Sequence, residues 1–180
     1  MTAWVYRGEV VIAKNVCIQH PVVYQGRGKL LIGNNVSLGF NLAGSLGNPI
    51  LLQPREQNAE IILGENCAIM NGCELIACKT ITIGKNTLIG PSTIIYDSDF
   101  HGVSPEQRNT PGKSAPVVIE ENVWIGARTI ILKGVHIGAN AVIAAGCVVS
   151  NNVPAGMIVA GNPMSVVGSV NQSGRQKTNE

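Results

Sequence analysis

Residues 119–153 read IEENVWIGARTIILKGVHIGANAVIAAGCVVSNNV, and an aliphatic residue stands at every sixth position from Ile119 to Val149. This period of six matches neither the turn of a helix nor the alternation of an amphipathic strand. It requires a short strand, a corner and another short strand, stacked so that the aliphatic residues fill one continuous interior. Asn and Gly adopt positive φ most cheaply and dominate the fourth slot of each unit, so we expect the corners there. The fourth-slot residues are Asn122, Arg128, Gly134, Asn140, Gly146 and Asn152.

The same register recurs upstream at 12–18, 32–38, 63–74 and 83–94, which predicts an all-β solenoid, a parallel β-helix. The repeat breaks twice. The stretch 96–118 is polar and must leave the coil as an inserted loop, whereas 41–60 is irregular and reads as an imperfect coil with a loop. We therefore expect one β-helix domain over 1–168, followed by a polar tail over 169–180.

The composition supports a repetitive aliphatic core and excludes several classes of protein. The 180 residues are 45% hydrophobic but only 4% aromatic, with 21 Gly, which suits tight turns around Ile, Val and Leu. A net charge of +2 without a basic run gives no reason to expect a nucleic-acid partner. No apolar run has the length of a membrane helix, and the first residues lack a signal-peptide pattern, so we expect a cytoplasmic protein. Five Cys without a CxxC pair argue against a disulfide framework or a zinc ribbon.

The units ITIGKNTLIGPS and VWIGARTIILKGVHIGANAVIAAGCVV resemble those of the hexapeptide-repeat acyltransferases, over about residues 10–168. The order of DSDFH (97–101), VWIGA, AAGCVV and AGNP is similar to that of the sugar O-acetyltransferase branch, which includes galactoside, maltose and surface-polysaccharide acetyltransferases. The resemblance implies a left-handed β-helix with a protruding active-site loop, a homotrimer with sites between subunits, acetyl-coenzyme A as donor, and a sugar or glycan hydroxyl as acceptor. It implies no metal.

His101 is the candidate general base, because a neutral hydroxyl is a poor nucleophile and histidine can accept and return a proton near neutral pH. It lies on the inserted loop and matches the position of the family's catalytic histidine. A surface-loop histidine is the alternative reading. His136 is expected to point outward and His20 precedes Pro21 near the first coil, so neither is expected to take part in the chemistry.

Other positions acquire site roles through the resemblance. Asn71 and Asp99 are candidate acceptor ligands, although Asn71 could equally be a corner residue, and Asp97 could orient the imidazole or serve a turn. Trp124 falls beside the acceptor or cofactor tunnel, with packing as its alternative role. The backbone N–H of Ala127 matches the donor to the acetyl carbonyl, and Ala145 matches the contact with the pantetheine arm.

One departure from the family pattern concerns the phosphates of coenzyme A. Relatives carry basic residues shortly after the GNP turn, where this chain has Ser165 and Gly168. Phosphate binding could fall to Lys133, to Arg128, or to Arg175 and Lys177 in the tail. Three cysteines, Cys67, Cys73 and Cys147, occupy the small-residue fifth slot, which favours packing over nucleophilic chemistry.

The sequence also leaves two other classes of function open, a metal hydrolyase and a non-catalytic scaffold. A metal hydrolyase related to carbonic anhydrase would need three histidines converging on zinc, and the spacing of His20, His101 and His136 is unlike that pattern. A non-catalytic scaffold would use the solenoid only as a surface. Within the transferase reading, the acceptor could also be an aminosugar amine, serine or an antibiotic hydroxyl.

Overall fold

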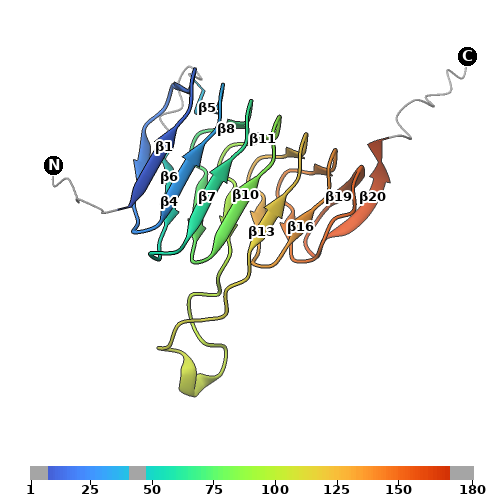
Figure 1. Ribbon diagram of the computed structural model, residues 1–180. Coiled ribbons are helices and arrows are strands. Elements are labelled where there is room, and N and C mark those ends of the chain that lie inside the picture. Colours follow the sequence, from blue (N-terminus) through green and yellow to red (C-terminus); the bar gives the residue numbers. More distant parts are fainter. Residues whose placement is uncertain (1–7, 41–47, 171–180) are drawn as a thin grey trace, which may run out of the picture.

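The computed structural model describes residues 8–40 and 48–170, which form a stack of coils running in chain order from β1 to β20 (Figure 1). Three sheets make up the walls, and every strand pair is parallel except β19–β20. The first sheet contains β1 (Glu9–Ile12), β4 (Lys29–Ile32), β7 (Glu60–Leu63), β10 (Thr80–Ile83), β13 (Val117–Ile119) and β16 (His136–Ile137). The second contains β2 (Cys17–Ile18), β5 (Ser37–Leu38), β8 (Ala68–Ile69), β11 (Leu88–Ile89), β14 (Trp124–Ile125), β17 (Val142–Ile143), β19 (Met157–Ala160) and β20 (Ser165–Ser169). The third contains β3 (Val22–Tyr24), β6 (Ile50–Pro54), β9 (Glu74–Ala77), β12 (Ile94–Tyr96), β15 (Ile130–Ile131) and β18 (Val148–Val149).

The first-slot aliphatic residues stack directly on one another from coil to coil. Ile83 pairs with Leu63 on one side and with Ile119 on the other, and Ile119 pairs in turn with Ile137. All four are at most 1% exposed, so they form the continuous interior that the repeat predicts.

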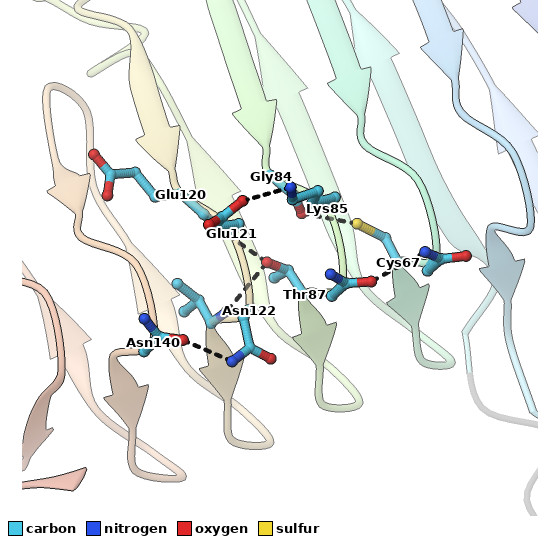
Figure 2. Close-up of polar contacts among 11 residues, drawn as sticks. Cys67, Gly84, Lys85, Thr87, Glu120, Glu121, Asn122 and Asn140 are labelled. Atoms are coloured by element: carbon cyan, nitrogen blue, oxygen red, sulfur yellow. Dashed lines mark hydrogen bonds and ion pairs between the residues drawn. The ribbon is translucent and has the colours of Figure 1, made fainter. Parts of the chain in front are cut away.

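The corners fall at the fourth slot, as predicted. Backbone φ is positive at Asn122, Arg128 and Gly134, and again at Asn140 and Gly146. Successive asparagines along one corner also bond to one another through their side chains, as Asn122 Nδ2 does to Asn140 Oδ1 at 2.7 Å (Figure 2). Asn152 is not among the positive-φ residues, because the hexapeptide register ends in the last coil, where the chain turns into the antiparallel pair β19–β20.

Glycine recurs at the second slot of the repeat, and the distance between neighbouring coils explains why. A Cβ built on Gly126 would lie 2.4 Å from the backbone N of Ala145 in the next coil, a distance that real Cβ atoms essentially never show. Glycine at this slot therefore sets the spacing between coils. The same close approach to the third-slot backbone nitrogen of the following coil recurs at Gly33, Gly64, Gly84, Gly90 and Gly138.

Polar atoms in the fifth slot bond to carbonyls of the following coil. Cys67 Sγ donates to the Gly84 carbonyl at 3.0 Å, and Thr87 Oγ1 donates to the Glu120 carbonyl at 3.1 Å (Figure 2). Burial raises the pKa of the Cys67 thiol and raises that of Cys73 to about 11, so both stay protonated at neutral pH. Cys147 is also fully buried, which confirms that these cysteines pack in the core.

The two breaks in the repeat have different outcomes. Part of the irregular segment 41–60 is β6, a regular member of the third sheet, while 41–47 lie outside the described residues. The polar loop leaves the stack between β12 and β13 and projects away from it. The short 3₁₀ helix η1 (Pro105–Gln107) lies at its far tip (Figure 1). The flanking strands include Tyr96, Val117 and Val118, so the loop proper, hereafter the projecting loop, spans 97–116 rather than 96–118.

The C-terminal region is strand-like for longer than the sequence suggests. Ser169, the first residue of the expected polar tail, still belongs to β20, and residues 171–180 lie outside the described part of the chain. Within the residues that the structure describes, no helix is long and apolar enough to cross a membrane.

Candidate active site

The base of the projecting loop is fixed by Asp97, which is fully buried. Its two carboxylate oxygens accept hydrogen bonds from the backbone N–H groups of Cys78 and Lys79, both at 2.7 Å. Burial raises the pKa of the Asp97 carboxyl, and these two N–H groups oppose that shift. Asp97 therefore anchors the loop to the β9–β10 corner, which is the turn role considered for it, and the bonded partner of the His101 imidazole is the Arg108 carbonyl.

We predict that Asp97→Ala lowers the free energy of unfolding by about 2 kcal/mol, because two part-buried N–H groups lose their acceptors. Urea denaturation measures this loss. The matched control is Asp99→Ala, which removes an ion pair whose side chains are about one-third exposed and should cost less than about 1 kcal/mol. Equal losses for the two variants would contradict the anchoring role.

Phe100 holds a strained turn directly before the candidate base. Its φ is +62°, and the N–H of His101 donates to the carbonyl of Asp99 at 2.7 Å, which closes a tight turn around Phe100. Positive φ is costly for a bulky residue and persists only where the surroundings enforce it. The Phe100 ring meets the Tyr96 ring edge-on with centroids 5.4 Å apart, and the guanidinium of Arg55 lies 5.7 Å from its centroid. These contacts fix the turn that presents His101.

The His101 imidazole is exposed and is held by one hydrogen bond, from Nδ1 to the carbonyl oxygen of Arg108 at 2.9 Å. A carbonyl can only accept, so Nδ1 carries the proton and Nε2 of the neutral ring has a free lone pair. This is the tautomer that a general base requires.

His101 faces a pocket of about 490 Å³ between the projecting loop and two preceding corners of the stack, hereafter the loop pocket. Parts of the chain far apart in sequence meet here: the end of β6, the β9–β10 corner and both sides of the projecting loop. Its lining residues are Arg55, Glu56, Cys78, Lys79, Ser98, Phe100, His101, Asn109, Thr110, Pro111, Gly112 and Ser114.

Asp99 and Lys133, predicted to contact acceptor and cofactor respectively, pair with each other in this chain, and those two roles stay predictions. Lys133 Nζ lies 2.8 Å from Asp99 Oδ1, and both side chains are about one-third exposed. Neither residue lines the loop pocket or the groove described next. The pair connects the projecting loop to the coil that follows it.

A second cavity, hereafter the apolar groove, runs along the outer face of the second sheet with a volume of about 600 Å³. It brings together three predicted site residues, Trp124, Ala127 and Ala145, and Trp124 is 58% exposed beside it. The backbone N–H groups of Ala127 and Ala145 donate to no acceptor within the described residues. The groove is lined by Ala68, Met70, Leu88, Ile89, Gly90, Pro91, Trp124, Gly126, Ala127, Val142, Ile143, Ala144 and Ala145.

Asn71 lies in neither cavity. It is 6% exposed, and its amide is used on both sides: Oδ1 accepts from the N–H of Phe40 at 2.8 Å, and Nδ2 donates to the Phe40 carbonyl at 3.1 Å. These contacts fit a corner residue, and the role of Asn71 as an acceptor ligand stays a prediction.

The three histidines have separate environments. His20 is buried with Nε2 3.0 Å from the Asn48 carbonyl oxygen, and exposed His136 pairs through Nε2 with Glu120 Oε1 at 2.8 Å. Over residues 8–40 and 48–170, no three His, Cys, Asp or Glu side chains come together as a metal site would require.

The positions where relatives carry basic residues, Ser165 and Gly168, both lie in β20. Arg128 is an exposed corner residue beside Ala127 but does not line the apolar groove, and Arg175 and Lys177 lie outside the described residues.

Known proteins share this architecture. A family model described as bacterial transferase hexapeptide (six repeats) matches residues 116–151. A Saccharomyces cerevisiae protein classed as an acetyltransferase is 33% identical over 77% of this chain and 72% of its own length. The galactoside O-acetyltransferase of Escherichia coli is 29% identical over 89% of this chain, and the match spans only 64% of that enzyme.

Solved structures of acetyltransferases are also similar to this chain. The maltose O-acetyltransferase of Clostridium difficile 630 superposes with a TM-score of 0.64 at 31% identity, over 77% of this chain and 68% of its own. A hexapeptide-repeat acetyltransferase of Vibrio cholerae, solved with acetyl-coenzyme A, gives 0.57 at 29% identity, over 83% and 71% of the two chains.

The chain belongs to the hexapeptide-repeat acyltransferase family, in the branch of the galactoside and maltose O-acetyltransferases. The expected fold, an all-β left-handed parallel β-helix with a protruding loop, is confirmed. The chain is an acetyltransferase by this membership.

Proposed function

We propose that this enzyme transfers the acetyl group of acetyl-coenzyme A to a hydroxyl of a sugar or surface-polysaccharide precursor, with His101 as general base. The observation that carries the proposal is the contact between Nδ1 of His101 and the Arg108 carbonyl oxygen, in a residue that lines the loop pocket. Because the carbonyl can only accept, Nδ1 is the donor and Nε2 is left as an acceptor. The five cysteines, none in a disulfide, are in keeping with a reducing compartment, which favours the cytoplasm.

The reaction needs no covalent enzyme intermediate. Nε2 of His101 removes the proton of the acceptor hydroxyl while its oxygen attacks the thioester carbonyl, forming a new C–O bond. The carbonyl oxygen becomes an oxyanion, and the unpaired N–H of Ala127 is the donor available to stabilise it. As the C–S bond breaks, the coenzyme A thiolate takes the proton from the imidazolium, which restores neutral His101.

The apolar groove suits the long, thin arm of acetyl-coenzyme A. Its floor is built from small residues such as Gly126, Ala127 and Ala145, so a narrow chain can lie against the coil backbone. Trp124 offers a broad apolar surface at its side. The free N–H of Ala145 is positioned to bond an amide carbonyl of that arm.

We propose a homotrimer, and the separation of these two parts supports it. The apolar groove and the loop pocket share no lining residue, although His101 must reach the thioester for transfer to occur. A complete site forms when the projecting loop of one subunit reaches the apolar groove of the next, and a closed ring of identical subunits gives each site both parts.

Replacing Trp124 by alanine tests the groove assignment. We expect Trp124→Ala to weaken acetyl-coenzyme A binding about tenfold in calorimetric titration, because a large apolar contact is lost. Leu132→Ala, which also removes an exposed apolar side chain but not from the groove, is the matched control and should leave the affinity unchanged. If well-folded wild-type protein fails to bind acetyl-coenzyme A at all, the transferase proposal is wrong and the scaffold reading replaces it.

A further inference from the structure

The carboxylates around the loop pocket already have partners. Glu56, which lines it, pairs with Arg27, which does not. Asp97 accepts from two backbone N–H groups, and Asp99 pairs with Lys133. Glu56 and Asp99 are thus paired with other cations, whereas Asp97 is fully buried and acts on Lys79 only through its charge, without an ion pair.

Two cations of the pocket wall have no such partner. Arg55 and Lys79 both line the pocket, and neither makes an ion pair with any carboxylate in the part of the chain that the structure describes. Arg55 lies over the ring of Phe100, the residue that directly precedes His101. Its positive charge is therefore held near the candidate base. Besides Glu56, His101 and the Cys78 thiol, the other polar groups of the wall are the uncharged side chains of Ser98, Asn109, Thr110 and Ser114.

We infer that the loop pocket selects an acceptor that carries an anionic group, a carboxylate or a phosphate, and that Arg55 and Lys79 bind this group. The inference rests on the proposed function, since it treats the pocket as the acceptor site. A volume of about 490 Å³ lies within the usual range of small-molecule sites. Hydrogen bonds between a cationic side chain and an oxyanion are about twice as strong as neutral ones, so two cations give a clear preference for charge.

Arg55 has a competing structural role, because stacking on Phe100 alone could account for its position. Lys79 has no ring contact, hydrogen bond or ion pair of its side chain among the described residues. Replacing Lys79 therefore tests anion binding without disturbing the turn at Phe100. For this reason Lys79→Gln is the informative variant.

The test measures equilibrium binding of three matched sugars to the full chain by ligand-observed NMR: galactose, galacturonate and galactose 6-phosphate. We expect at least one charged sugar to bind roughly tenfold more tightly than galactose. Lys79→Gln should remove most of that preference, and added salt should weaken it, because both cations are exposed. Lys14→Gln, which removes an exposed lysine from the first coil, should leave the preference unchanged.

A preference for galacturonate identifies an acidic sugar as the acceptor class, and a preference for galactose 6-phosphate identifies a phosphorylated one. Equal binding of all three sugars, no binding of either charged sugar, or a preference that survives Lys79→Gln would overturn the inference. Calorimetry with acetyl-coenzyme A is run on the same preparation. If the protein does not bind acetyl-coenzyme A, the result counts against the proposed function. If it binds acetyl-coenzyme A but shows no preference for a charged sugar, the result counts against the inference alone.

Discussion

His101→Ala is expected to lower kcat for acetyl transfer by roughly 10²–10⁴-fold, the usual contribution of a positioned general base. Affinity for acetyl-coenzyme A should stay within about twofold, because the imidazole is exposed on the projecting loop and does not line the apolar groove. Stability should also change little, since the side chain makes a single hydrogen bond on the surface. Steady-state kinetics with saturating donor measures kcat, calorimetric titration measures the affinity for acetyl-coenzyme A, and thermal denaturation measures stability.

The control for this variant is His136→Ala, which removes an exposed histidine that pairs with Glu120 on the first sheet. Its kcat should match that of the wild type. If His101→Ala retains normal turnover, the histidine is a surface-loop residue and another group must deprotonate the acceptor.

Gly126→Ala is expected to lower the free energy of unfolding by about 3 kcal/mol, the upper part of the range for overpacking a close-packed site. The added methyl group would lie 2.4 Å from the backbone nitrogen of Ala145, so two coils must separate to admit it. For a chain of this size, the loss corresponds to a fall in Tm of about 6–12 °C. Because Gly126 also lines the apolar groove, acetyl-coenzyme A binding should weaken as well.

Gly168→Ala provides the comparison, since a Cβ there meets only the end of the Ile158 side chain at 3.8 Å and φ is not positive. Its Tm should remain within about 2 °C of the wild type. Similar losses for both variants would show that glycine at the second slot does not set the coil spacing.

The six-residue repeat made the fold predictable, because its signals are local and repeated. The interior at Ile119 and Ile137 and the corners at Asn122 and Gly134 follow from slot positions alone. The second-slot glycines were equally visible in the sequence. Their meaning depends on how far one coil lies from the next, which a linear pattern does not contain.

The site was only partly predictable, because its contacts join coils at irregular separations. Trp124 and Ala127 lie in one coil of a regular stretch and Ala145 lies in the next coil, so their shared groove could be anticipated. Arg55 comes from the irregular segment 41–60, and Lys79 comes from the β9–β10 corner, between the regular stretches 63–74 and 83–94. That they meet beside the projecting loop depends on how the irregular segment enters the stack and on where the loop lies.

The same limit explains the residues whose contacts differ from expectation. The amide of Asn71 is taken up by the backbone of Phe40, at the edge of that irregular segment. Lys133 and Asp99 are brought together only because the loop between them returns to the stack. Where a residue lies in the repeat could be read from the sequence, but which long-range partner it meets could not.

Complementation between two variants tests whether His101 of one subunit acts in the apolar groove of the next. His101→Ala and the groove-filling variant Ala145→Trp are each expected to be nearly inactive alone. Unfolded together and refolded as a 1:1 mixture, they should regain about a quarter of wild-type activity, because each mixed trimer contains one interface with both intact parts. Activity no greater than the sum of the separate variants, with mixed trimers shown to be present, would contradict a site shared between subunits.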